Sequence, residues 1–219
     1  MFRVNILVDG TPETLFAAII AISLSETGDK KLHAYGIIDG QDLLSSTGFT
    51  GPGLCGSGVF INAYESMLEI RMSILDALME SLQNMAGGRA VAVEPEVIQG
   101  KPVDRLPDLL NSESILIVSG HESNAGLIKH VSEELNLQTA TVTVNGEGRR
   151  VVLLFRDKAT LDDLIPRLKQ QFPGAQIPDP SGSASVISNA IVIDNVEPDC
   201  LAASNQDAKW PWRANFTAA

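Results

Sequence analysis

Apolar runs of strand length alternate along the chain with longer amphipathic stretches. The first run, Val4 to Val8, stops at Asp9-Gly10 and leads into Pro12 and Glu13, which suit the first turn of a helix. Further strand-like runs occupy residues 32–38, 91–98, 114–118, 139–144 and 186–194. Strands that alternate with helices are typical of a parallel sheet with right-handed crossovers. The pattern therefore predicts an α/β protein with a doubly wound, mostly parallel sheet.

The intervening stretches predict helices. Their spacing places these at about residues 13–27, 62–85, 103–110, 127–135 and 160–171, with the last broken or kinked at Pro166. The second helix has an amphipathic pattern and carries four of the five methionines, at 67, 72, 79 and 85, which we interpret as core packing. A turn at 145–148 predicts that residues 151–155 fold back beside the strand at 139–144 and cover its edge.

Three parts follow from this pattern. Residues 1–146 form the α/β domain, 147–195 extend the same sheet, and 196–219 are a tail with little periodicity. The length of 219 residues suits one large domain or a common domain with an extension.

Charge narrows the range of partners. The chain has 16 Lys and Arg against 27 Asp and Glu, a net charge of -11, which repels nucleic acid and anionic lipid. The longest apolar run, residues 15–24, is too short to span a bilayer, and acidic residues precede it where a signal peptide is positive. Cys55 and Cys200 form neither a disulfide framework nor a CxxC motif. We expect a cytoplasmic protein with free thiols that binds neither nucleic acid nor membrane.

Several segments, taken in order, resemble the universal stress protein family over about residues 3–145. They are Ile6-Leu7-Val8-Asp9-Gly10-Thr11, Leu32 to Asp39, a long helix after a variable loop, Val97-Ile98-Gln99-Gly100-Lys101-Pro102, Ser114 to Gly120, and Val131 to Leu135 before Ala140 to Val144. The resemblance implies a Rossmann-like or flavodoxin-like sandwich that either binds ATP in its cleft or has lost that ability. Family members commonly pair as dimers, so a homodimer is also expected.

The resemblance also implies a set of binding residues. In nucleotide-binding members, the acid after the first strand and the end of the second strand hold adenosine, which corresponds here to Asp9 and Ile37. The phosphates lie on a loop with the pattern Gly-x2-Gly-x9-Gly and then Ser or Thr. The candidate ligand-binding residues are Asp9, Gly10, Thr11, Ile37, Asp39, Gly100, Gly120, His121, Ser123, Asn124 and Gly126.

The phosphate loop departs from the family pattern. Ser123 replaces the second glycine, Lys129-His130 replace the final pair, and Glu122 adds a negative charge. Glycines let backbone N–H groups converge on an oxyanion, so these changes predict weak ATP binding. We therefore expect no firmly bound cofactor, with ATP or AMP as the alternative.

The remaining polar and glycine-rich motifs have structural explanations that are simpler than catalysis, metal binding or phosphate binding. Asp9, Asp39, His121 and Glu122 all follow predicted strands, so they either converge on a cleft for a metal ion or proton transfer, or cap turns. No second histidine lies nearby, and no metal site or catalytic residue is assigned. Gly51 to Gly56 match GxGxxG in letters but do not directly follow a strand, so a surface loop is favoured over a phosphate cradle.

Both tryptophans lie in the tail. Trp210 and Trp212 flank Pro211, and they either pack on their own domain or anchor a partner protein. Taken together, the sequence predicts a non-catalytic regulatory or ligand-sensing protein with a degenerate nucleotide loop. Two alternatives stay open: an adenine-nucleotide-binding stress protein with weak or no ATP hydrolysis, and an enzyme with an acidic cleft.

Overall fold

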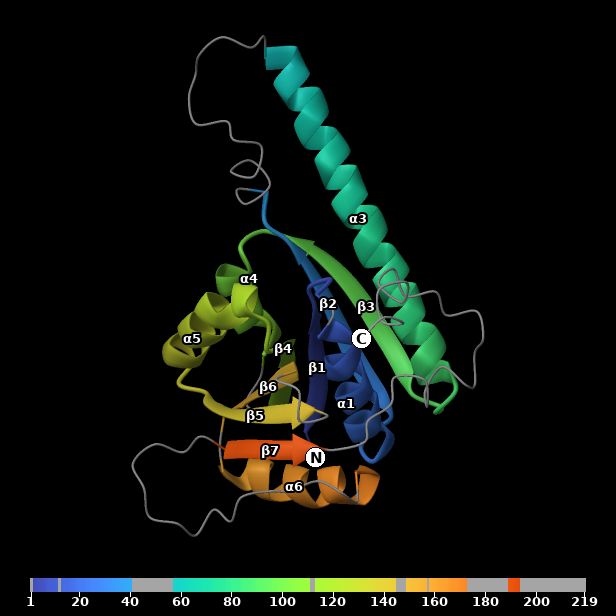
Figure 1. Cartoon of the computed structure of the whole chain (residues 1–219), viewed down its shortest axis with the longest axis vertical. Helices are drawn as coiled ribbons and strands as arrows, with labels where there is room; N and C mark the ends of the chain where they lie inside the picture. Colours follow the sequence, from blue (N-terminus) through green and yellow to red (C-terminus); the bar gives the residue numbers. More distant parts are fainter. Residues whose placement is uncertain are drawn as a thin grey trace.

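A seven-stranded sheet organises the protein (Figure 1). The computed structural model describes residues 2–11, 13–40, 57–110, 113–144, 149–156, 158–172 and 189–193. The strand order is β3-β2-β1-β4-β6-β5-β7, and of these strands β6 alone is antiparallel to its neighbours. The strands are β1 (Arg3–Val8), β2 (Lys31–Ile38), β3 (Ala92–Gln99), β4 (Ser114–Ser119), β5 (Gln138–Val144), β6 (Arg149–Phe155) and β7 (Asn189–Ile193). The predicted mostly parallel α/β fold is confirmed.

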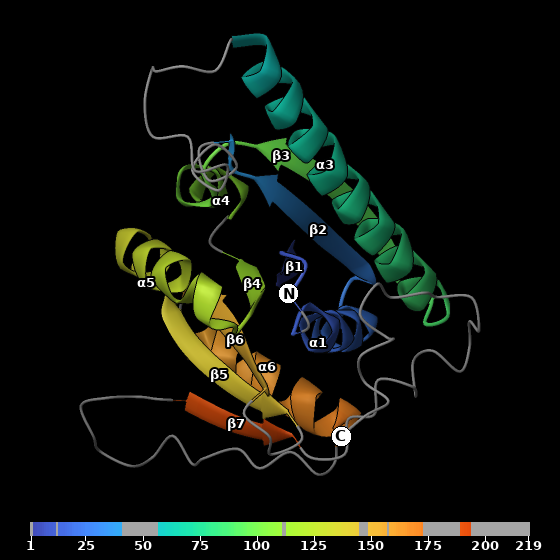
Figure 2. The ribbon, with the colours of Figure 1, turned by 45° about the horizontal axis from the view of Figure 1, so that its top comes forward.

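Helices cover both faces of this sheet (Figure 2). They are α1 (Thr14–Glu26), α3 (Ser57–Gly87), α4 (Pro102–Leu109), α5 (Ala125–Glu134) and α6 (Lys158–Gln171), with a 3-10 turn, η1 (Glu122–Asn124), before α5. One core lies under α1, α3 and α6, and it takes Val4, Ile6 and Val8 from β1. The other lies under α4 and α5 and takes Leu7. The period-two alternation of β1 therefore supplies both cores.

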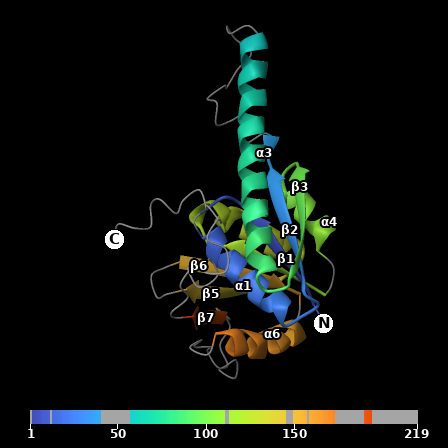
Figure 3. The same cartoon turned by 90° about the vertical axis from the view of Figure 1, so that its right-hand side faces the viewer.

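Helix α3 lies close to β2 and then continues beyond the sheet. A Cβ on Gly36 would lie 3.1 Å from a methyl carbon of Leu75 and 3.2 Å from Met79 Cε, so glycine permits this close approach. The C-terminal half of α3 buries Leu78, Leu82 and Met85. The core packing predicted for the methionines is wrong for Met72, which is exposed because it lies at the margin of the face of α3 that packs on the sheet. Its N-terminal half projects past the carboxyl end of β2 (Figures 1 and 3). Only part of this helix is therefore held by the core.

Strand β6 occupies a different place from the one predicted. It pairs with β5 in the expected antiparallel hairpin, but it lies between β4 and β5, where Val151 pairs with both Ser119 and Val142. The outer edge of β5 is instead paired with β7. Residues 151–155 are all buried, and a strand that is apolar on both faces is stable only inside a sheet.

Helix α6 continues through Pro166, so of the two predicted outcomes, a break or a kink, the break is wrong. Leu164 and Leu168 are both buried, and their packing holds the helix together on either side of the proline. Four predictions concern residues outside the described ranges: the glycine motif at 51–56, the free thiols of Cys55 and Cys200, the turn at 145–148, and the tail with both tryptophans. Over the described part of the chain, no helix combines the length and hydropathy needed to cross a membrane.

Candidate functional site

Asp9 lies at the carboxyl end of β1, where the chain turns sharply. Gly10 adopts a φ of 79°, a conformation that favours glycine, and it brings Thr11 back toward Asp9. The backbone N–H of Thr11 donates to Asp9 Oδ1 at 2.9 Å, and the Thr11 hydroxyl donates at 2.8 Å. The hydroxyl of Thr14, in the first turn of α1, donates to the same oxygen. Asp9 therefore fixes the turn that starts α1.

The second carboxylate oxygen of Asp9 is bonded from the neighbouring strand. Ser119 Oγ, at the end of β4, donates to Asp9 Oδ2 at 2.5 Å. Asn124 Nδ2 donates to the same oxygen and also to Ser119 Oγ at 2.8 Å. These bonds join the loop after β1 to the loop after β4, because the two strands are adjacent in the sheet.

The hydrogen bonds also set the charge of Asp9. Burial alone raises the pKa of this carboxyl, but the bonds from Ser119, Thr14, Thr11 and Asn124 outweigh burial and lower the pKa below its ordinary value. The carboxylate is therefore ionised at neutral pH and saturated by protein donors. A group in this state is suited to holding loops in place and poorly suited to accepting a proton.

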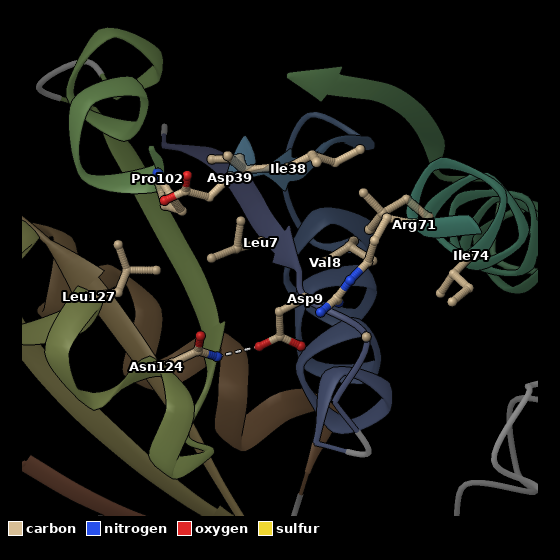
Figure 4. Close-up of a pocket in the computed structure, with 13 residues that line it drawn as sticks. Leu7, Val8, Asp9, Ile38, Asp39, Arg71, Ile74, Pro102, Asn124 and Leu127 are labelled. Atoms are coloured by element: carbon tan, nitrogen blue, oxygen red, sulfur yellow. Dashed lines mark hydrogen bonds between the residues drawn. The ribbon is translucent and has the colours of Figure 1, made fainter. Parts of the chain in front are cut away.

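A pocket of about 170 Å³ opens beside Asp9 (Figure 4). Its polar groups are Asp9, Asp39, Asn124 and Arg71, and the Arg71 side chain extends from α3 toward the Asp9 side of the pocket (Figure 4). Arg71 makes no hydrogen bond or ion pair with another described residue. The rest of the lining is largely apolar: Leu7, Val8, Gly10, Ile37, Ile38, Ile74, Leu75, Pro102 and Leu127. Among the described residues that line it, Arg71 is the one cation, and the rest of the wall is largely apolar.

The loop from Gly120 to Gly126 uses several of its own backbone donors. Gly120 N–H donates to the carbonyl of Arg150 in β6 at 2.6 Å. Ser123 N–H donates to His121 Nδ1 at 3.3 Å, and Asn124 N–H donates to the His121 carbonyl at 3.0 Å. These N–H groups donate within the protein and are unavailable to a phosphate.

A second groove lies on the other side of the start of α5. Its volume is about 410 Å³, and it is open and shallow beside β5 and β6. Lys129 and Arg150 contribute cations, and Glu122 contributes a carboxylate. The remaining lining residues are Gly120, His121, Ala125, Ile128, Ser132, Thr139, Thr141 and Val152. Residues 120–121 therefore face a different groove from Asp9.

The structure separates the residues that the sequence placed in a single cleft. Asp9, Gly10, Ile37, Asp39 and Asn124 line the first pocket. Thr11 lines neither cavity but donates two hydrogen bonds to Asp9. Four candidates line neither cavity. Besides Thr11, they are Gly100, which has a φ of 138° and adjoins Arg105, Ser123, which bonds His121, and Gly126, in the first turn of α5.

His121 and Glu122 are likewise apart from Asp9 and Asp39, because they line the second groove. Within the described ranges, no three His, Cys, Asp or Glu side chains are grouped so as to hold a metal ion.

Sequence reasoning missed several contributors to the first pocket. Ser119 and Thr14, which hold Asp9, are signalled only by their positions at the end of a strand and the start of a helix. Arg71 and Ile74 come from the part of α3 nearest the carboxyl ends of β1 and β2. The long amphipathic pattern predicted α3 but not which of its turns lies over the strand ends.

Comparison with protein families and with curated proteins finds no match. Among solved structures, the chain is similar to a protein from the universal stress protein family of Burkholderia pseudomallei. The TM-score is 0.34 and the sequence identity 13%, over 77% of this chain and 91% of the other. Similarity at this level does not transfer a function to the chain.

Proposed function

We propose that this protein is a non-catalytic, ligand-sensing regulatory protein that binds a small ring-containing molecule in the pocket beside Asp9. The observation that carries this proposal is the pocket itself. It has a volume of about 170 Å³ and apolar walls, and it is bordered by the Asp9 carboxylate, whose oxygens accept hydrogen bonds from the protein. Ligands of open α/β sheets bind at the carboxyl ends of the strands, which is where this pocket lies.

The pocket volume limits the size of the ligand. A cavity of about 150 Å³ accommodates a benzene ring. A pocket of about 170 Å³ therefore suits a nucleobase or another compact ring system and leaves little room for a triphosphate chain. Because the loop at 120–126 uses its N–H groups internally, we expect the phosphates of a nucleotide to add little affinity.

The state of Asp9 argues against a role in proton transfer. A general base needs a pKa near the working pH, whereas the pKa of Asp9 is lowered. His121 and Glu122, the other candidates for acid–base chemistry, line the second groove. Ligand recognition without chemical conversion is the function that best fits these positions.

Calorimetric titration with adenosine, AMP and magnesium ATP tests the proposal. At about 0.3 kcal/mol of affinity per non-hydrogen atom, adenosine is expected to bind with a Kd of tens of micromolar. ATP is expected to bind no more tightly than adenosine, with a Kd above about 10 micromolar. Failure of all three compounds to bind at millimolar concentration would exclude an adenine ligand.

Two substitutions on neighbouring positions locate the binding. Leu127→Trp adds bulk to a side chain that lines the pocket, whereas Ile128→Trp adds the same bulk on the second groove. We expect Leu127→Trp to abolish adenosine binding and Ile128→Trp to preserve it. The reverse result would place the ligand in the second groove.

A second candidate function is adenine-nucleotide binding with weak or no hydrolysis. It is favoured by one observation: Asp9 and Ile37, the positions that the resemblance assigns to adenosine, line the same pocket. ATP that binds at least tenfold more tightly than adenosine in the titration would favour this function over the first.

A further inference from the structure

Helix α3 projects beyond the sheet (Figures 1 and 3), and its middle part carries exposed apolar side chains. The exposed large hydrophobic residues among those described are Ile70, Met72 and Ile74, and 60% of Ile70 is accessible to solvent. Ile70 and Ile74 are one helical turn apart and share a face, whereas Met72 lies on the opposite side of the helix. An exposed pair of this kind on a projecting helix is a candidate contact surface.

We propose that the segment Lys209–Arg213 of the same chain docks on the Ile70–Ile74 face of α3. This segment contains both tryptophans of the protein, at 210 and 212. Tryptophan supplies the largest apolar surface of any side chain, so it is the residue with most to gain from covering two exposed isoleucines.

The spacing of the two partners matches. Pro211 favours an extended backbone for the residue before it, and in an extended segment the side chains of Trp210 and Trp212 lie on one side, about 6.6 Å apart. Ile70 and Ile74 are separated by about 6 Å along the helix axis. Each indole ring therefore meets one isoleucine.

The charges are also complementary. Lys209 and Arg213 flank the tryptophans and are the only Lys or Arg residues after Lys169. The exposed stretch of α3 around Ile70 carries three acidic side chains, Glu65, Glu69 and Asp76, against one cation, Arg71. In a chain of net charge -11, a positively charged segment is attracted to such an acidic stretch at short range.

The chain is long enough to make this contact. Strand β7 ends at Ile193 and lies five strands from β2, which corresponds to about 24 Å across the sheet. The roughly 17 residues from Ile193 to Trp210 reach about 56 Å when fully extended. Ile74 also lines the ligand pocket, so docking brings the tail to the rim of that pocket.

Tryptophan fluorescence of the full chain tests the contact, since the only tryptophans are in the docking segment. We expect blue-shifted emission and weak quenching by acrylamide in the unchanged protein. Ile70→Asp is expected to shift the emission to that of free tryptophan, and Ile70→Leu is expected to restore the blue shift. Met72→Asp is the matched control, because it places the same charge on the opposite face and should leave the emission unchanged.

Exchanging the charges of the tail gives a second, independent variant. Lys209→Glu with Arg213→Glu is expected to shift the emission toward that of free tryptophan, because both new carboxylates face the acids of α3. Emission like that of free tryptophan in the unchanged protein would overturn the proposal. Equal shifts in Ile70→Asp and Met72→Asp would also overturn it, as would a blue shift that disappears on dilution, which would indicate docking on a second copy.

Discussion

At the scale of single residues, Asp9 determines how the loops around the pocket are held. Its two oxygens receive hydrogen bonds from Thr11, Thr14, Ser119 and Asn124, which come from the turn after β1, α1, β4 and the turn before α5. Asp9→Asn replaces one acceptor oxygen with a donor group facing other donors. We expect a loss of about 2 kcal/mol of unfolding free energy at pH 7, measured by urea denaturation.

The effect of Asp9→Asn depends on pH in a direction that follows from its lowered pKa. The carboxylate stabilises the folded state above the unfolded pKa, near 3.8, and this contribution is lost as the pH falls through the lower folded pKa. The gap in stability between the unchanged protein and Asp9→Asn is therefore expected to be full at pH 7 and to narrow below about pH 4. A gap of the same size at pH 3 would show that the charge of Asp9 is not the cause.

Asp162→Asn is the control for this pair of measurements. Asp162 is exposed on α6, so its substitution is expected to change the stability by less than about 0.5 kcal/mol at any of these pH values.

The position of Asp9 at the end of the first strand was predictable from the sequence alone. Ser119 and Thr14 were not, because their roles depend on β4 being the neighbour of β1.

At the scale of elements, the insertion of β6 between β4 and β5 shapes the loop that follows β4. Gly120 is tied to Arg150 in β6, and a Cβ at position 120 would lie 2.6 Å from the Arg150 carbonyl oxygen and 2.8 Å from its carbonyl carbon. Backbone atoms inside a sheet cannot move aside cheaply. Gly120→Ala is therefore expected to lower the unfolding free energy by about 2–3 kcal/mol.

Gly126→Ala is the matched substitution at the other end of the same loop. Gly126 lies in the first turn of α5, with no atom within 4 Å of a Cβ built there, so alanine is expected to be neutral or to stabilise by up to about 1 kcal/mol. Thermal or urea unfolding of both variants tests the prediction. Similar stabilities for the two variants would contradict the close packing of β6 against Gly120.

The sequence contained a signal for the position of β6 that the hairpin prediction did not use. Residues 151–155 are Val-Val-Leu-Leu-Phe, with no polar residue between them, whereas a strand at a solvated edge alternates. The strand itself was predictable from its composition and its turn. Its neighbours were not, because a hairpin with β5 can form on either side of β5, and only the packing of the whole sheet selects one.

At the scale of the whole molecule, the two edges of the sheet differ in how they meet other chains. Strand β3 forms one edge and exposes Glu94, Pro95 and Glu96, residues that discourage pairing with another strand. Strand β7 forms the other edge, and its sequence, Asn-Ala-Ile-Val-Ile, contains neither charge nor proline. We propose that the protein is a homodimer, as expected from the sequence, and that β7 is the edge that continues the sheet into a second copy.

Truncation after residue 185 tests this route to a dimer. The shorter chain keeps β6, and β5 still has β6 as a hydrogen-bonded neighbour, so the fragment is expected to fold and to show cooperative thermal unfolding. Light scattering is expected to give about twice 23.4 kDa for the full chain and a monomer for the fragment. A fragment that stays dimeric would exclude β7 and favour another surface, such as the projecting part of α3. A net charge of -11 on each copy opposes association, so only a specific contact can hold two copies together. A full chain that is monomeric at micromolar concentration would therefore show that β7 makes no such contact.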